Sequence, residues 1–176
     1  MLLVSVLPDA PLIVTLLLDE ATQHRFNALR QAHFPAARNY LQAHVTLFHH
    51  LPGSGYAAVA AELRNLAATT APLPVQVTGL RFLGQGVAYS LENAALQQLH
   101  RHLQTTWANW LTPQDRQPLR PHVTVQNKVL PAVARELHAQ LALTFQPGLA
   151  TGVGLGLWAY RGGPWEALDQ FAFAGK

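Results

Sequence analysis

The chain contains one short pattern twice, and this repeat constrains its fold more than any other feature. Residues 44–47 read HVTL, and residues 122–125 in the second half of the chain read HVTV. With nine histidines in 176 residues, about half of one H-x-T is expected by chance, so a single copy would carry little weight. Two copies with valine in the middle and an apolar residue behind are far rarer. We therefore interpret the pair as functional.

Each copy predicts a strand with one apolar wall and one polar wall. Side chains at positions i and i+2 of an extended strand share a face, so the histidine and threonine of each copy point the same way. Two such strands at one cleft would supply two proton-transfer groups and two hydroxyls around a small anion. These four residues are His44, Thr46, His122 and Thr124. The alternative is a pair of ordinary strands whose histidines are half-buried and structural.

The composition favours a single folded domain that spans residues 1–176. Apolar residues make up 49% of the chain and charged residues only 12%, so a sizeable core can form. Cysteine is absent, which excludes disulfides and thiolate metal sites. The net charge of +3 suits a small phosphorylated ligand or the end of an RNA strand. No run of Lys and Arg is present to follow the backbone of a long duplex.

The first residues are apolar but do not resemble a signal peptide. No Lys or Arg precedes the run from Met1 to Leu7, and Pro8 and Asp9 interrupt it. No apolar stretch approaches the length of a membrane span. We therefore expect a soluble, cytoplasmic protein.

Hydrophobic periodicity predicts alternating strands and helices along the chain. The expected strands are 11–18, 43–51, 75–83, 87–91, 121–126, 143–145, 151–160 and 165–173. The expected helices run from Glu20 to before Pro35, over 56–70, from Asn93 to about Trp107 and over 131–141. Asp19 and Asn93 are suited to cap two of them.

The order of these elements predicts the architecture. Each half offers a helix, an H-x-T strand, a second helix and a strand pair joined by a glycine-rich turn. This order indicates an internal structural repeat and predicts an α+β fold, with helices on the outer faces of antiparallel or mixed sheets.

At these residues the sequence resembles the two-histidine (2H) phosphoesterase superfamily, which includes the bacterial 2′-5′ RNA ligase-like proteins and cyclic phosphodiesterases. The resemblance rests on residues 44–48 (HVTLF) and 119–125 (LRPHVTV). It implies a bilobal α+β fold of two pseudo-symmetric lobes, with the two motif strands lining a central cleft. The activity that it implies is cleavage or formation of phosphodiester bonds without a metal or other cofactor, often on 2′,3′-cyclic phosphates or 2′-5′ linkages. It also implies that His44 and His122 are the acid–base pair and that Thr46 and Thr124 bind phosphate. Relatives often carry a basic residue where Asn127 stands here, and Lys128 is one position on.

Histidine suits this chemistry because its ordinary pKa of about 6.5 makes both protonation states accessible. Opening a cyclic phosphate requires a base that takes a proton from water and an acid that protonates the departing sugar oxygen. One histidine must be neutral and the other protonated, which predicts a bell-shaped pH–rate profile. The sequence leaves open which histidine is the acid.

Four further residues are candidate substrate contacts. Phe48 and Tyr40 flank the first motif and could stack on a base, while Arg120 and Arg161 could contact phosphate. The adjacent pair His49 and His50 is expected to lie on the surface or in a loop, and the remaining histidines are expected to be structural.

Two other functions use the same residues. A metal-dependent hydrolase could use four histidines, but none of the nine acidic residues lies near either motif. The four are His44, His49, His50 and His122. A non-catalytic module could bind nucleotides or RNA ends in the same cleft without turnover. For the phosphoesterase that the resemblance implies, the expected partner is a nucleotide or RNA terminus that bears a cyclic phosphate or a 2′-5′ linkage. We expect a monomer with no membrane or protein partner.

Overall fold

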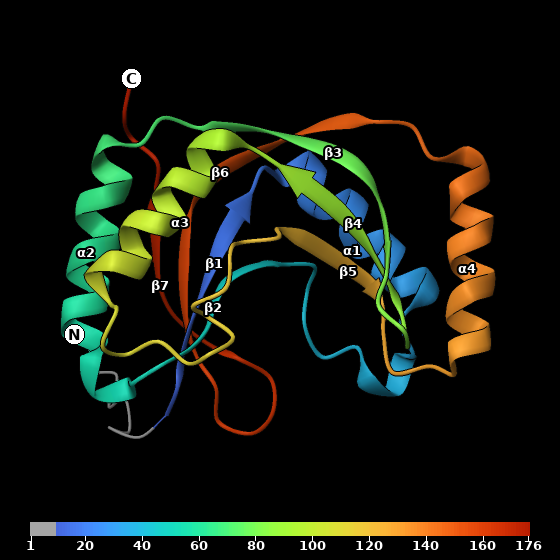
Figure 1. The fold of residues 1–176 in the computed structure, drawn as a ribbon, viewed down its shortest axis with the longest axis horizontal. Helices are drawn as coiled ribbons and strands as arrows, with labels where there is room; N and C mark the ends of the chain where they lie inside the picture. Colours follow the sequence, from blue (N-terminus) through green and yellow to red (C-terminus); the bar gives the residue numbers. More distant parts are fainter. Residues whose placement is uncertain (1–9) are drawn as a thin grey trace.

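A computed structural model describes residues 10–176, which form one antiparallel sheet of seven strands with helices outside it (Figure 1). The expectation for Met1 to Leu7 lies outside the described residues. The strand order is β2-β1-β6-β3-β4-β5, and β7 also pairs with β6. The strands are β1 (Leu12–Leu18), β2 (Val45–Leu51), β3 (Leu73–Phe82), β4 (Val87–Glu92), β5 (His122–Gln126), β6 (Gly148–Ala159) and β7 (Glu166–Ala172). The two motif strands, β2 and β5, therefore end the sheet on opposite sides.

The helices begin where the sequence predicts. They are α1 (Glu20–His33), α2 (Tyr56–Thr69), α3 (Ala94–Thr106) and α4 (Pro131–Thr144). Asp19 caps α1 by accepting a 3.0 Å hydrogen bond from the backbone N–H of Thr22. Asn93 caps α3 in the same way through the N–H of Leu96, at 2.7 Å. Both predicted caps are confirmed. Within residues 10–176, no helix is long and apolar enough to cross a membrane.

Strand β6 joins two lobes of the sheet. Its first residues pair with β3, and its later residues lie between β1 and β7. Gly152 is the crossing point, because it pairs with both Leu18 and Leu73. A Cβ atom at Gly152 would lie 2.9 Å from the side chain of Leu16, so only glycine fits this crossing without displacing the core. The predicted two-lobed α+β fold is confirmed.

Each motif strand packs against the helix that precedes the other motif in the chain. Helix α1 precedes the first motif in the chain but packs against β5, which carries the second motif (Figure 1). Helix α3 precedes the second motif but contacts β2, where His100 stacks on Phe48 with ring centroids 4.6 Å apart. Helices α2 and α4 stay with the lobes of β7 and β3. The two pseudo-symmetric halves therefore cross over: α1 pairs with β5, and α3 pairs with β2.

One expected element is wrong. Residues 143–145 do not form a strand, because α4 continues to Thr144 and β6 begins at Gly148. Leu143 is 87% exposed, whereas a central strand would bury it. Pro147 disfavours helical backbone at the residue before it, so the helix can continue almost to that point. The final strand is also slightly shorter than expected, running over Glu166–Ala172.

Candidate functional site

Each motif strand carries a β-bulge directly after its threonine. In β2, Thr46 pairs with Thr15 and Phe48 pairs with Val14, so Leu47 is an extra residue. The register of β5 against β4 has the same irregularity. There Thr124 pairs with Ala88 and Gln126 with Val87, so Val125 is the extra residue. A bulge reverses the alternation of side chains beyond it.

The bulge decides where Phe48 and His49 lie. Before it, His44 and Thr46 are half-buried and Val45 is buried, as the alternation predicts. Beyond it, Phe48 joins Leu47 in the core and is fully buried. Contrary to expectation, Phe48 therefore does not face the cleft and is not available to stack on a substrate. The side chain of His49 points outward instead of that of Phe48.

The threonine of each motif lines a cavity together with the histidine of the other motif. His44 and Thr124 line a cavity of about 520 Å³, and Thr46 and His122 line a second cavity of about 400 Å³. The edge strands β2 and β5 contact each other although they stand at opposite ends of the strand order. The curvature of the sheet therefore brings together the four motif side chains that the sequence singles out.

The two imidazoles are held in the same way. The Nδ1 atom of His44 donates to the carbonyl oxygen of Gln42 at 2.8 Å, and that of His122 donates to the carbonyl of Arg120 at 2.8 Å. A carbonyl can only accept, so the hydrogen of each neutral ring sits on Nδ1 and Nε2 carries the lone pair. Neither Nε2 has a hydrogen-bond partner among the described residues. Each is therefore free to exchange a proton with a ligand.

Both imidazoles favour the neutral form. The pKa of His44 is lowered from 6.5 to about 4. Burial is the main cause, the hydrogen bond to Gln42 opposes it, and the charges of Arg30 and His122 add to the lowering. Burial is also the main cause that lowers the pKa of His122, with the charge of Arg81 contributing. The charge of His122 is among the causes that lower the pKa of His44, in agreement with the contact between β2 and β5.

Arg30 is a buried cation that sequence reasoning missed. It is 4% exposed, and burial lowers its pKa to about 10. Its Nη1 donates to the carbonyl oxygen of Thr124 at 2.9 Å and its Nε to Asn39 at 3.2 Å. No carboxylate within residues 10–176 forms an ion pair with it. Arg30 lines the cavity of His44 and Thr124, so an anion there would supply the missing counter-charge. In the sequence, Arg30 stands out only as one residue of the helical periodicity that predicts α1.

The wall beside His44 is aromatic. The ring of Trp165 lies 4.6 Å from the His44 ring between centroids. Tyr40 lines the same cavity and is 67% exposed, so it is available to a ligand as the sequence suggests. Phe34 and Tyr160 complete this wall. Asn127 and Lys128 also line it, and both therefore lie near Thr124.

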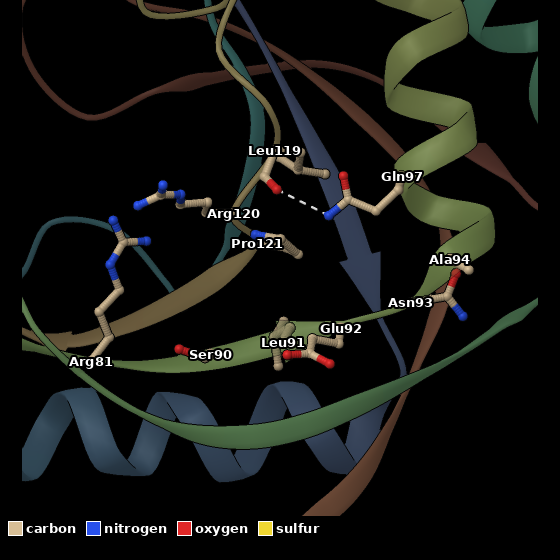
Figure 2. Close-up of a pocket in the computed structure, with 10 residues that line it drawn as sticks. All are labelled: Arg81, Ser90, Leu91, Glu92, Asn93, Ala94, Gln97, Leu119, Arg120 and Pro121. Carbon is tan, nitrogen blue, oxygen red and sulfur yellow. Dashed lines mark hydrogen bonds between the residues drawn. The ribbon is translucent and has the colours of Figure 1, made fainter.

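The wall beside His122 is cationic. Arg120 is exposed and lines the His122 cavity together with Arg81 of β3. Figure 2 shows the two guanidinium groups extending toward the same opening, at the edge of an adjoining cavity of about 570 Å³. Arg161 lies elsewhere. It pairs with Glu166 across the β6–β7 turn and lines neither motif cavity.

The histidines of the metal alternative do not gather into a ligand set. Within residues 10–176, no group of three or more His, Asp or Glu side chains is arranged to hold a metal ion. His50 is exposed on β2, and the Nδ1 of His49 is bonded to Asp115 at 2.9 Å.

This geometry defines a bilobal α+β protein with one H-x-T motif on each edge of a curved sheet. The chain belongs to the 2′-5′ RNA ligase superfamily, the family of 2H phosphoesterases, whose model matches residues 18–164. The family resemblance is thereby confirmed. No curated protein matches the chain at a significant level.

Solved structures share the fold over nearly the whole chain. The protein TT0787 of Thermus thermophilus is 16% identical with a TM-score of 0.67, and the match covers 94% of this chain and 99% of that one. Escherichia coli LigT complexed with NADP+ is 17% identical with a TM-score of 0.59, covering 94% and 98%. LigT complexed with 3′-AMP is 20% identical with a TM-score of 0.57, covering 93% and 98%.

Proposed function

We propose that the protein is a metal-independent phosphoesterase that acts on 2′,3′-cyclic phosphate or 2′-5′ phosphodiester bonds of nucleotides or RNA ends. The observation that carries this proposal is the crossed arrangement of the motifs, in which each threonine lines a cavity together with the other motif's histidine. A phosphoryl group between the two strands would meet an imidazole from each side. The family and the binding of phosphate and 3′-AMP by LigT support the same chemistry.

In the proposed hydrolysis, one imidazole takes a proton from water through Nε2 while the water oxygen attacks phosphorus. The bond from phosphorus to one ribose oxygen then breaks, and the second imidazole protonates that oxygen. His44 and His122 fill these two roles, and the reverse reaction exchanges them. Each proton transfer contributes on the order of 10²–10⁴-fold to the rate.

Charge that gathers on the non-bridging oxygens needs donors. The hydroxyls of Thr46 and Thr124 are neutral donors that line the two motif cavities, and Arg30 offers a buried positive charge in the cavity of Thr124. The aromatic wall with Tyr40 and Trp165 suits the base of the nucleotide, since base–aromatic stacking does not depend on the identity of the base. Arg120 suits a phosphate oxygen on the His122 side.

The test is turnover of 2′,3′-cyclic nucleotides and 2′-5′-linked dinucleotides, with products resolved, in the presence of a chelator. Activity should persist without a divalent ion, and loss of activity that is rescued by a metal would support the metal-dependent alternative. His44→Ala and His122→Ala should each lower kcat by about 10²–10⁴-fold with little change in affinity. His102→Ala is the matched control, because His102 is a surface residue paired with Glu62.

The second candidate is a nucleotide-binding or RNA-end-binding module without turnover, which the buried cation Arg30 would serve equally well. Such a module would retain a 2′,3′-cyclic nucleotide unopened after prolonged incubation. Its histidine variants would lose affinity rather than rate.

A further inference from the structure

His49 is held in place by a buried carboxylate. Asp115 is 3% exposed, and its oxygens accept hydrogen bonds of 2.9 Å from the Nδ1 of His49 and from the backbone N–H groups of His49 and His50. Burial by itself raises the pKa of Asp115, but these hydrogen bonds outweigh it, so the net pKa lies below its ordinary value. The carboxylate is thus ionised and accepts from the ring. It fixes the hydrogen on Nδ1 and directs Nε2 away from the loop that carries Asp115.

The bulge at Leu47 places this ring in line with the motif residues. His44, Thr46 and His49 lie on the outward side of the same strand, and Phe48 lies on the inward side. Residues that are successive on one strand face are roughly 7 Å apart. An imidazole next to Thr46 therefore reaches the space that the threonine hydroxyl faces. The corresponding position after the bulge in β5 is Asn127, which lines the other cavity.

The surroundings of His49 suit an anion. It lines the cavity of about 400 Å³ together with Thr46 and His122, and its own side chain is 43% exposed. The other ionisable groups on this cavity are Arg81, Arg120, His100 and Asp115. Asp115 is committed to the bonds described above, which leaves the open part of the cavity with cationic groups and neutral donors.

We propose that His49 is a third substrate-binding imidazole: in its doubly protonated form it donates from Nε2 to a non-bridging phosphate oxygen, while Nδ1 donates to Asp115 and holds the ring. This role deepens the proposed function and rests on it for the identity of the substrate. The phosphate would then be contacted from both strands, by the motif residues and by His49 on the cationic wall.

The first experiment compares His49→Ala and His49→Gln with His50→Ala, the adjacent exposed histidine. Binding of inorganic phosphate and of 3′-AMP is measured by calorimetry. His49→Ala should weaken binding of both by about tenfold to a hundredfold, the range for a hydrogen bond to a charged group. His49→Gln, which retains a donor, should lose less, and His50→Ala should match the wild type. Equal affinity in His49→Ala and the wild type would overturn the proposal, and so would an equal loss in His50→Ala.

The second experiment separates contact with the ligand from a structural role. Imidazole nitrogen resonances are followed by NMR while inorganic phosphate is added to the wild-type protein. Phosphate should shift the Nε2 resonance of His49 and leave His50 and His102 unchanged. A purely structural His49 would keep its resonance, and the proposal would then be wrong. Thermal unfolding of the variants checks that the bonds of Asp115 to the backbone still hold the loop.

The outcomes distinguish this proposal from the proposed function. If the protein never opens cyclic nucleotides but phosphate shifts the Nε2 resonance of His49, the proposed enzyme activity is wrong and the proposed binding role of His49 is supported. If the protein turns over cyclic nucleotides and His49→Ala has the same rate and affinity as the wild type, the proposed activity is supported and the proposed role of His49 is wrong. Absence of phosphate binding to the wild-type protein would remove the role of His49 as well.

Discussion

The guanidinium of Arg30 donates a 2.9 Å hydrogen bond to the backbone carbonyl of Thr124, which joins helix α1 to the second motif strand. The two residues are 94 positions apart in the chain. The same buried cation lines the cavity of His44 and lowers the pKa of that imidazole. One side chain therefore affects both motifs.

Replacing Arg30 by methionine should weaken binding of phosphate and 3′-AMP by about tenfold to a hundredfold, because a charged donor in the cavity is lost. The pKa of His44 should rise, since the positive charge that lowers it is gone. Calorimetry and NMR titration of the His44 ring measure the two effects. Arg25→Met on the same helix is the control, because Arg25 lies over Phe26 and outside this cavity. A His44 pKa that stays the same or falls in Arg30→Met would contradict this prediction.

The pH optimum of kcat/KM should lie on the acid side of 6.5. The pKa of His44 is about 4 and that of His122 is below 6.5 in the free protein. A mechanism with one neutral and one protonated imidazole is fastest between those two values, and kcat/KM reports the free enzyme. The rate should fall below the lower pKa as the base becomes protonated, and above the higher pKa as the acid loses its proton. A maximum of kcat/KM above pH 7 would show that the imidazoles do not titrate in this way.

Phe48 and Tyr40 should behave in opposite ways when replaced by alanine. Phe48→Ala should lower the free energy of unfolding by about 3–5 kcal/mol, since the ring is fully buried between His100 and Trp107. Tyr40→Ala should leave stability within about 0.5 kcal/mol. If the ring stacks on a base, Tyr40→Ala should weaken nucleotide binding by about 1–3 kcal/mol. Denaturant unfolding and calorimetry with 3′-AMP and inorganic phosphate separate the effects, because only the nucleotide has a base. Comparable losses for both ligands would argue against stacking.

Gly86 should not accept a side chain. A Cβ atom there would lie 2.0 Å from the backbone carbonyl oxygen of Gln126, the residue after the β5 bulge. Gly86→Ala should therefore cost at least about 2 kcal/mol of stability and displace the strand that carries His122. Gly79→Ala is the matched control on the same hairpin, because nothing lies within 4 Å of its Cβ position. A fully stable and active Gly86→Ala protein would show that the hairpin can shift at no cost.

The sequence predicts most of the elements because their signals are local. The caps at Asp19 and Asn93, the apolar run of β1 and the glycine turn between β3 and β4 all depend on neighbouring residues. The end of α4 is harder to predict because Leu143 is apolar yet exposed, and an apolar residue alone does not show whether it is buried.

The motif residues can be found in the sequence because they repeat, whereas their neighbours cannot be placed from it. The bulges at Leu47 and Val125 reverse the faces of the residues that follow, Phe48 and His49 among them. The bulges are seen only in the register of these strands against β1 and β4. Arg30 and Asp115 reach the site from elements remote in the chain, and no local pattern marks either residue.

The crossed packing of α1 on β5 and of α3 on β2 makes the two halves of the chain mutually dependent. A cut between α2 and β3 would give each fragment the helix that belongs on the other fragment's motif strand. Neither piece would be a small version of the whole, and only their reassociation would restore two complete lobes. The two motif histidines are therefore brought together only when both halves of the chain fold as one unit, because neither half contains the helix that packs on its own motif strand.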